Sequence, residues 1–363
     1  MKQYDVAIVG AGIAGASLAA EIAPHASVLL IEAEDQPGYH ATGRSAAFWS
    51  ESYGGPGVQP LTTASGPALL EGGFLAPLGS LHIGRAEDAA KVDAFIAAFA
   101  GTVTLERVDP APFVPGLRDE WTLGVMEASS AYIDVAALHA DYLARARRAG
   151  AALVTGAPLR AAARTDGQWR LETGAGAFAA GLMVNAAGAW ADDVARIAGA
   201  APIGIQPYRR TMVQLRTHPA VPPGVPHVTD ISGAFYFKPE AGGRLWLSPH
   251  DETPVDPGDV QPEELDVAIA IDRLEHVVDW RVAAVERRWA GLRSFAPDRQ
   301  PVYGFDPRVP GFFWCAGQGG FGIQTAPAGA LLAAALLLER PADPVVAAID
   351  PARYAPDRFR QLA

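Results

Sequence analysis

A glycine-rich turn between an apolar run and a helix-like segment constrains this chain more than any other feature of its sequence. The run Tyr4–Gly10 is mostly apolar, as in parallel strands that are buried on both faces, and Ile13–Ile22 has helical spacing. Gly10 permits a tight turn, Gly12 lets the backbone approach a bound group, and Gly15 lets the helix pack closely on the strand. A strand, this turn and a helix together predict a site for a dinucleotide pyrophosphate at the helix N-terminus.

An acidic residue at the end of the next apolar run supports this interpretation. Ser27–Glu32 reads as a second buried strand, and Glu32 lies about 20 residues beyond the turn. A carboxylate at this place holds the ribose hydroxyls of adenosine and repels a 2′-phosphate, which disfavours NADP. The motif identifies only the ADP half of the cofactor, and FAD and NAD share that half.

Three further segments favour a flavin. Gly38–Ala47 offers backbone and hydroxyl groups to a diphosphate and ribityl chain, and its Ser45 is suited to begin a helix. Small residues in Val184–Trp190 let the backbone pass close to a cofactor. Gly317–Gln324 precedes the last helix, whose N-terminus would stabilise a reduced flavin ring. Taken singly, these segments are also compatible with an ordinary loop, close strand–helix packing and a glycine turn.

Together the segments resemble the amino-acid-oxidising, FAD-dependent family that includes D-amino acid oxidase, glycine oxidase and monomeric sarcosine oxidase. Within that family the likeness is greatest to bacterial D-arginine dehydrogenases. It extends over nearly the whole chain, through Gly10–Gly15, Gln36–Tyr53, Val184–Trp190, Gln206–Arg210, Phe235–Pro239, Trp289–Phe295 and Gly319–Thr325.

The resemblance implies FAD as a non-covalent cofactor. Sarcosine oxidases attach their flavin to a cysteine, but Cys315 lies within an apolar run and is interpreted as a buried structural residue. The residues expected at the cofactor are Gly10, Gly12, Ile13, Ala14, Gly15, Glu32, Ala33, Thr42, Gly43, Arg44, Ser45, Ala46, Ala47, Ala187, Gly188, Trp190, Gly319, Gly320, Phe321, Gly322, Ile323 and Gln324.

A buried substrate carboxylate requires a charged partner, and the planar fork of arginine suits it. The resemblance assigns this role to Arg210 and Arg293, with Tyr236 beside them. It also places Tyr53 near the reacting carbon and the backbone carbonyl of Gly320 at the substrate amine. Taken alone, each arginine would more commonly form a surface ion pair, and Tyr53 could pack on the core.

Three departures from the arginine-selective relatives concern specificity. Ser80 stands where those relatives have a glutamate that receives a cationic side chain, Phe48 replaces a histidine, and Ser50 replaces a threonine. Loss of the carboxylate and gain of a phenyl ring predict neutral or apolar D-amino acids as substrates.

The predicted reaction is hydride transfer from Cα to flavin N5, which yields a 2-oxo acid and ammonia after hydrolysis. The alternatives left open are oxidation of a secondary amine (sarcosine-like or opine-like), oxidation of a 2-hydroxy acid, and a flavin-binding subunit without its own turnover. Resemblance favours a quinone-type or other electron acceptor, and no motif encodes reactivity with oxygen.

Composition excludes several kinds of partner. The net charge of −11 and the absence of Lys/Arg clusters argue against nucleic acid. The longest apolar helical run, Ala326–Leu338, is too short to span a membrane and contains Pro327 and Gly329. One cysteine and no metal-ligand spacing predict neither a disulfide nor a metal site. We therefore expect a cytoplasmic protein, with peripheral association with the inner membrane left open.

Strand–helix units at both ends of the chain predict an α/β (α+β) fold. Its discontinuous Rossmann-like FAD-binding domain comprises residues 1–75, 134–204 and 291–363, and an inserted mixed-sheet substrate domain comprises 76–133 and 205–290. Helices are expected at Glu87–Ala100, Val135–Ala149 (with Asp134 as N-cap), Pro262–Val278 and Gln324–Glu339. Strands are expected at Thr211–Arg216, Ala234–Lys238, Arg244–Leu247 and Phe312–Ala316, and Leu153–Val154, Trp169–Thr173 and Phe178–Val184 are expected to form an antiparallel layer.

Overall fold

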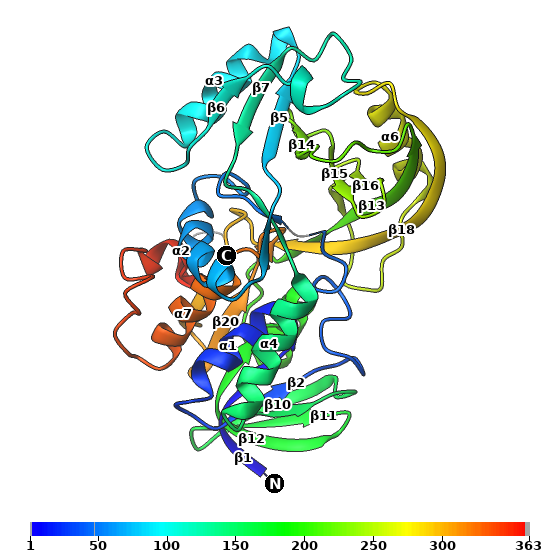
Figure 1. The fold of residues 1–363 in the computed structure, drawn as a ribbon. Helices are drawn as coiled ribbons and strands as arrows, with labels where there is room; N and C mark the ends of the chain where they lie inside the picture. The colour runs from blue at the N-terminus through cyan, green and yellow to red at the C-terminus, as the bar shows by residue number, and fades with distance from the viewer. Residues whose placement is uncertain (1, 47, 360–363) are drawn as a thin grey trace.

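Two large sheets, each with its own helices, organise the chain (Figure 1). The computed structural model describes residues 2–46 and 48–359. Its helices are α1 (Ile13–Ile22), α2 (Gln59–Glu71), α3 (Ala89–Ala98), α4 (Val135–Arg148), α5 (Ala191–Ile197), α6 (Glu264–Glu275) and α7 (Ala326–Leu337).

The first sheet has eight strands, in the order β10-β11-β12-β1-β2-β9, with β20 added to β12 and β19 to β20. Strands β12, β1, β2 and β9 run parallel to one another, and β20 runs parallel to β12. Their bounds are β1 (Lys2–Val9), β2 (Val28–Ile31), β9 (Ala152–Val154), β10 (Leu159–Thr165), β11 (Gln168–Thr173), β12 (Gly176–Asn185), β19 (Val302–Phe305) and β20 (Phe312–Ala316).

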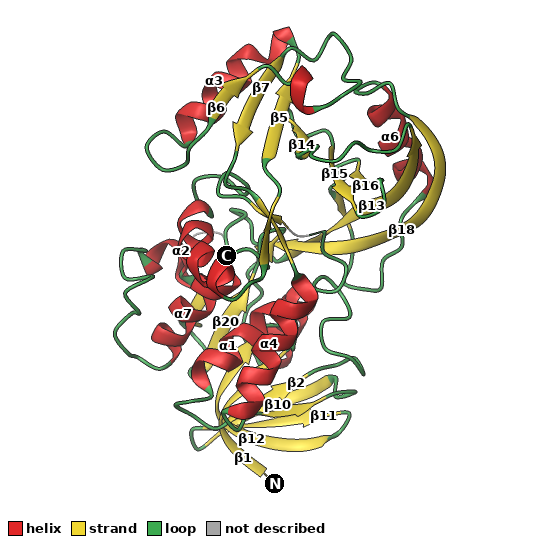
Figure 2. Ribbon diagram, in the orientation of Figure 1, coloured by secondary structure: helices red, strands yellow, loops and turns green. Residues whose placement is uncertain are grey.

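Helices α1, α4 and α7 cover one face of this sheet (Figure 2). Ile8 and Leu30 of the sheet and Leu18, Leu138 and Leu332 of the three helices belong to one buried cluster. Burial of this apolar surface is the main force that holds the helices on the sheet.

The second sheet has ten strands, in the order β21-β18-β13-β16-β15-β14-β5-β7-β6, with β17 added to β13. The long antiparallel strands β13 and β18 form its curved side, and α6 packs against them (Figure 1). Their bounds are β5 (Ser80–Gly84), β6 (Glu106–Val108), β7 (Leu123–Glu127), β13 (Gln206–His218), β14 (His227–Asp230), β15 (Tyr236–Glu240), β16 (Arg244–Ser248), β17 (Thr253–Pro254), β18 (Arg281–Phe295) and β21 (Gln318–Gly319).

A small third sheet, of order β3-β8-β4, joins the loop after β2 to the start of α4. Its strands are β3 (Phe48–Trp49), β4 (Leu75–Pro77) and β8 (Ala131–Ile133). It fixes the chain directly before residues 50–53, which contact Glu127 of the second sheet.

The predicted α/β class with a Rossmann-like region and a mixed sheet is confirmed. The cap of α4 is as expected, since Asp134 Oδ1 accepts a hydrogen bond from the Ala137 amide at 2.9 Å. The division into residue ranges stays a prediction. At the 290/291 boundary, β18 runs through without a break.

Two expectations are wrong. Ser45 does not begin a helix, because the chain continues into strand β3. Residues 152–154 do not join the antiparallel layer of β11 and β12, but pair in parallel with β2 at the opposite edge. A three-residue apolar segment has too little periodicity to specify its partner, and packing after the crossover helix α4 decides it.

Candidate active site

A cavity of about 430 Å³ runs from the β1–α1 turn to the second sheet. Its walls come from the end of β2, most of the loop 38–46, and residues 186–190 and 318–323. Arg210, Tyr236 and Arg293 of the second sheet close its far end. The cavity therefore lies at the carboxyl ends of parallel strands, where open α/β sheets bind their ligands.

The glycine turn forms the first part of this wall for steric reasons. Gly10 has a φ of +102°, and a Cβ built there would lie 2.3 Å from the carbonyl oxygen of Ala186. At Gly15 a Cβ would lie 1.9 Å from the oxygen of Gly10, so α1 packs directly on the turn. Both positions exclude any side chain, and they leave the start of α1 facing the cavity.

The N-terminus of α1 has no side-chain cap from Gly12. Instead, the Ile13 amide donates to the hydroxyl of Thr42 at 3.0 Å. Thr42 comes from the loop after β2, so this bond fixes that loop beside the helix end. The dipole of the helix and the neighbouring hydroxyl suit an anion such as a pyrophosphate.

The carboxylate of Glu32 is held rigidly at the end of β2. One oxygen accepts from the Ala11 amide at 2.9 Å and the other from the Glu34 amide at 3.1 Å. Each oxygen has a second lone pair, which a sugar hydroxyl can use. Ala33, also predicted at the cofactor, lines the cavity next to it.

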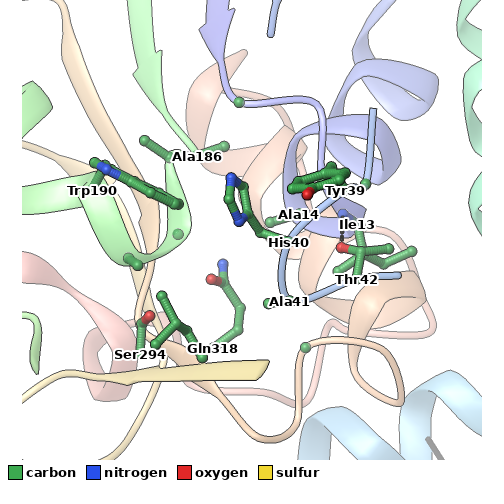
Figure 3. Close-up of a pocket in the computed structure, with 18 of the residues that line it drawn as sticks. Ile13, Ala14, Tyr39, His40, Ala41, Thr42, Ala186, Trp190, Ser294 and Gln318 are labelled. Atoms are coloured by element: carbon green, nitrogen blue, oxygen red, sulfur yellow. Dashed lines mark hydrogen bonds between the residues drawn. The ribbon is translucent and has the colours of Figure 1, made fainter. Parts of the chain in front are cut away.

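His40 is a cavity residue that the sequence motifs did not single out. Figure 3 shows its ring in the cavity with Trp190, and the two ring centroids are 4.6 Å apart. Nε2 lies 2.8 Å from Glu34 Oε1, whereas Nδ1 is buried and finds no partner in the part of the chain that the structure describes. Since Nε2 faces a carboxylate it carries a proton, and Nδ1 is left to interact with a ligand.

Most of the residues predicted at the cofactor line this cavity, namely Gly10, Gly12, Ile13, Ala14, Glu32, Ala33, Thr42, Arg44, Ser45, Ala46, Ala187, Gly188, Trp190, Gly319, Gly320, Gly322 and Ile323. Four others have contacts within the protein instead. Gly15 and Gly43 support turns, Phe321 packs against Tyr53, and Gln324 contacts the loop 50–53. Contact of these four with a cofactor stays a prediction, and Ala47 lies outside the described residues.

Arg44 borders the cavity, but its guanidinium is directed into the protein. It pairs with Asp259 and donates to the carbonyls of Val260 and Ala290 at 3.2 and 3.3 Å. These contacts fix the loop 38–46 against β18 and residues 259–260.

A second cavity, of about 20 Å³, adjoins the far end of the first. Phe48, Tyr53 and Gln324 line it together with residues shared by both cavities, among them Arg293 and Gly320. At Gly320 a Cβ would lie 2.9 Å from the Tyr53 hydroxyl, so a side chain there would crowd this end of the site.

Two arginines face this junction from neighbouring strands. Arg210 of β13 pairs with Gly291 of β18, and Arg293 pairs with Tyr208, so the two guanidinium groups lie on one face of the sheet. Arg293 donates to the hydroxyls of Tyr53 at 2.7 Å and Tyr236 at 3.3 Å.

Arg210 is anchored from behind. Its Nε donates to the carbonyl of Asp251 at 2.8 Å, and its Nη2 to Glu252 at 3.1 Å. Its Nη1 is buried and has no partner among the described residues. Burial, and then the nearby Arg293, lower the pKa of Arg210, although a guanidinium remains charged in proteins. Arg210 also pairs with Asp251 and Glu252, and its unused buried donor lies beside a second arginine, an arrangement that can accept an anion such as a carboxylate.

The structure brings Tyr53, Tyr236, Arg210, Arg293, Gly320 and Phe48 together at this junction. It does not bring Ser50 or Ser80 to either cavity. Ser50 binds Glu127 through its hydroxyl at 2.8 Å, and Ser80 lies 2.9 Å from Nδ1 of His227. His227 lies behind Phe48, with ring centroids 4.1 Å apart. No motif marked Glu127 or His227, because each acts through partners far away in the sequence.

Cys315 lies in β20 and is buried. Burial raises the pKa of its thiol to about 12. It is not among the residues that line the two cavities. Among the described residues, no helix has the length and apolar character to cross a membrane.

Comparison with known proteins extends these observations. The curated FAD-dependent oxidoreductase domain-containing protein 1 of Bos taurus is 32% identical over 177 residues, which are 44% of this chain and 36% of that protein. The bifunctional protein ThiO/ThiG of Synechocystis is 27% identical over 250 residues, 67% of this chain and 36% of that protein. The match thus spans about a third of each relative's length.

Solved structures share the whole fold. Glycine oxidase from Geobacillus kaustophilus superposes with a TM-score of 0.85 at 24% identity, over 98% of each chain. L-Proline dehydrogenase from P. horikoshii superposes with a TM-score of 0.86 at 20% identity, over 99% of this chain and 98% of that one. A family model described as FAD dependent oxidoreductase (DAO) matches residues 5–336. This chain therefore belongs to the DAO family of FAD-dependent oxidoreductases.

Proposed function

We propose that this chain oxidises D-amino acids with neutral or apolar side chains to imino acids, which water hydrolyses to 2-oxo acids and ammonia. The observation that carries the proposal is the buried, unpartnered Nη1 of Arg210 beside Arg293. An α-carboxylate would supply an acceptor for this Nη1 and a negative charge between the two guanidinium groups.

The residues that line the main cavity suit FAD, the cofactor of the family. The glycine cradle at Gly10 and Gly12 and the end of α1 would hold the pyrophosphate. Glu32 would bind the ribose, and the free nitrogen of His40 offers a further contact. Bound FAD supplies the acceptor for the two electrons that leave the substrate as hydride. With Cys315 away from the cavity, we propose non-covalent binding.

The chain's own residues position the substrate. Arg210 and Arg293 hold its carboxylate, and the hydroxyls of Tyr53 and Tyr236 fix Arg293 in place. With that end fixed, Cα and its amine lie towards the main cavity, where the Gly320 carbonyl is the proposed acceptor for the amine. Loss of hydride from Cα and of a proton from nitrogen gives the imino acid, and no acid–base pair is required.

The surroundings of the small cavity favour neutral side chains. No Asp or Glu is among the described residues that line it, Arg293 is one of its lining residues, and Arg210 lines the adjoining cavity. A cationic side chain would find repulsion and no charged partner. Phe48 and Tyr53 offer apolar surface instead. The preference for the D-enantiomer rests on the resemblance of Tyr53, Arg210, Tyr236 and Arg293 to D-amino acid dehydrogenases, which also suggests a quinone-type electron acceptor.

The test is an anaerobic visible spectrum of the flavin-loaded protein, mixed in turn with D- and L-alanine, D- and L-methionine, D-arginine, sarcosine and D-lactate. Loss of the flavin band with D-alanine and D-methionine is expected, with second-order rate constants for flavin reduction at least about tenfold above that for D-arginine. Faster flavin reduction by the L-enantiomers would refute the proposed preference for D-amino acids. Flavin reduction by sarcosine or D-lactate alone would refute the proposed substrate class. Reoxidation by a soluble quinone and by air would then identify the acceptor.

A further inference from the structure

A fully buried carboxylate lies outside both cavities and has no part in the proposed chemistry. Glu127 ends strand β7, and its side chain is 0% exposed. Its three hydrogen-bond donors are consecutive in sequence. Oε1 accepts from the Glu51 amide at 2.6 Å, and Oε2 accepts from the hydroxyls of Ser50, at 2.8 Å, and Ser52.

These bonds explain how a charge can be buried here. Burial raises the pKa of Glu127, while the bonds from Ser52, Ser50 and the Glu51 amide counteract that rise. A buried carboxylate without such donors would be strongly destabilising. The carboxylate and residues 50–52 therefore depend on each other for these hydrogen bonds.

The same loop is held from its other side by Gln324. The side-chain oxygen of Gln324 accepts from the Ser50 amide at 3.3 Å, and its nitrogen donates to the Tyr53 carbonyl at 3.0 Å. The nitrogen also donates to Thr62 of α2 at 2.9 Å. Two buried side chains thus fix residues 50–53 between β7 and the segment that precedes α7.

The next residue in the chain is the one that reaches the anion site. Tyr53 follows Ser52 directly, and its hydroxyl accepts from Arg293 at 2.7 Å. Its ring lies between those of Phe48 and Phe321, each with a centroid separation of 5.0 Å. A shift of about 1 Å in residues 50–52 would break the bond to Arg293, since hydrogen bonds weaken steeply with distance and angle.

We propose that Glu127 is a positioning residue, which sets the place of Tyr53 against Arg293 through the loop 50–52. The proposal rests on the proposed carboxylate site. Ser80 lies directly across the β5–β7 ladder from Glu127. Of these two facing residues, the carboxylate belongs to Glu127 of β7, and it binds residues 50–52.

The test compares Glu127→Ala with Glu127→Gln in the flavin-loaded protein, with benzoate as the carboxylate probe. The Kd of benzoate is measured from the change that its binding causes in the flavin spectrum. E127A is expected to weaken benzoate binding about tenfold, as for the loss of one hydrogen bond to a charged group. E127Q should stay within about threefold of wild type, because its oxygen accepts from Glu51 and its amide donates to serine hydroxyls that can rotate.

Glu106→Ala on the adjacent strand β6 is the matched control, because Glu106 is exposed and forms no side-chain bond in the described structure. If E127A does not fold, the double variant Ser50→Ala/Ser52→Ala takes its place and should weaken benzoate binding by a similar factor. Where E127A folds, adding it to that double variant should have little further effect, since all three groups act through one loop.

The outcomes separate the two proposals. E127A could bind benzoate as tightly as wild type, per bound flavin, and yet unfold at a lower temperature. That result would show a purely structural role for Glu127 and overturn the positioning proposal. A wild-type protein whose flavin spectrum responds to neither benzoate nor amino acids would overturn the carboxylate site itself. Weaker benzoate binding by E127A, together with benzoate binding close to wild type by E127Q, supports both the carboxylate site and the positioning role of Glu127.

Discussion

The substitution Arg210→Lys tests the anion site most directly. The three guanidinium nitrogens of Arg210 have different partners. Nε donates to the Asp251 carbonyl and Nη2 to Glu252, whereas Nη1 has no partner among the described residues and is available to a ligand. A lysine keeps the positive charge but has one nitrogen. It can either take over the bonds to the protein or reach the ligand, but not both.

The expected decrease in kcat/KM follows from the loss of one hydrogen bond between residue 210 and the ligand. One charge-assisted hydrogen bond contributes roughly 1.5–3 kcal/mol, which corresponds to a decrease in kcat/KM of about 10- to 150-fold. The loss should appear for every amino acid that is a substrate, because all share the carboxylate. The FAD content should remain that of wild type, since the glycine turn is distant in sequence and lies at the other end of the cavity.

Arg209→Lys is the matched control. Arg209 is the adjacent residue of β13, is also buried, and pairs with Glu263 and Asp266 without lining either cavity. Initial rates with D-alanine and an artificial electron acceptor, normalised to bound flavin, provide the measurement. An R210K enzyme within about threefold of wild type, or an equal loss in R209K, would refute a ligand-binding role for Arg210.

Three further predictions concern other parts of the molecule. Gly10→Ala should abolish FAD binding, because its Cβ would lie 2.3 Å from the Ala186 carbonyl oxygen; full flavin loading by absorbance ratio would contradict this. Phe48→Ala should open space towards His227 and raise the kcat/KM of D-methionine relative to D-alanine; an unchanged ratio would show that Phe48 does not limit the side chain. Cys315 should resist iodoacetamide at about pH 8 until the protein unfolds. Its raised pKa of about 12 stabilises the fold below about pH 9, and this contribution should be lost as the pH rises towards 12, which urea unfolding at several pH values can measure.

Local sequence signals predicted the first sheet well. The apolar runs of β1 and β2 and the glycine turn between them depend on periodicity and on steric exclusion within a few residues. The α4 helix was equally clear, because its cap at Asp134 is local. By contrast, α2 was not predicted, since Pro67 and Gly66 interrupt its pattern and packing against α7 stabilises it.

Candidate site residues could be predicted where a motif or a resemblance placed them, as at Arg210, Tyr236 and Arg293. Residues that support them were missed. Glu127 has no recognisable neighbours in sequence and becomes meaningful only because β7 lies beside the loop 50–53. Gln324 was expected at the cofactor, but the structure bonds it to that same loop.

The sequence by itself determined the glycine turn, the acid at the end of β2 and the pairs of strands and helices at both ends of the chain. These features follow from forces that act over a few residues, namely backbone sterics, capping and the alternation of apolar side chains. Only the tertiary structure decided that Ser80 faces His227 rather than a cavity, that Arg44 is directed to Asp259, and that Arg210 keeps one nitrogen free. Such outcomes depend on which buried polar groups find partners, and those partners come from segments far apart in the chain.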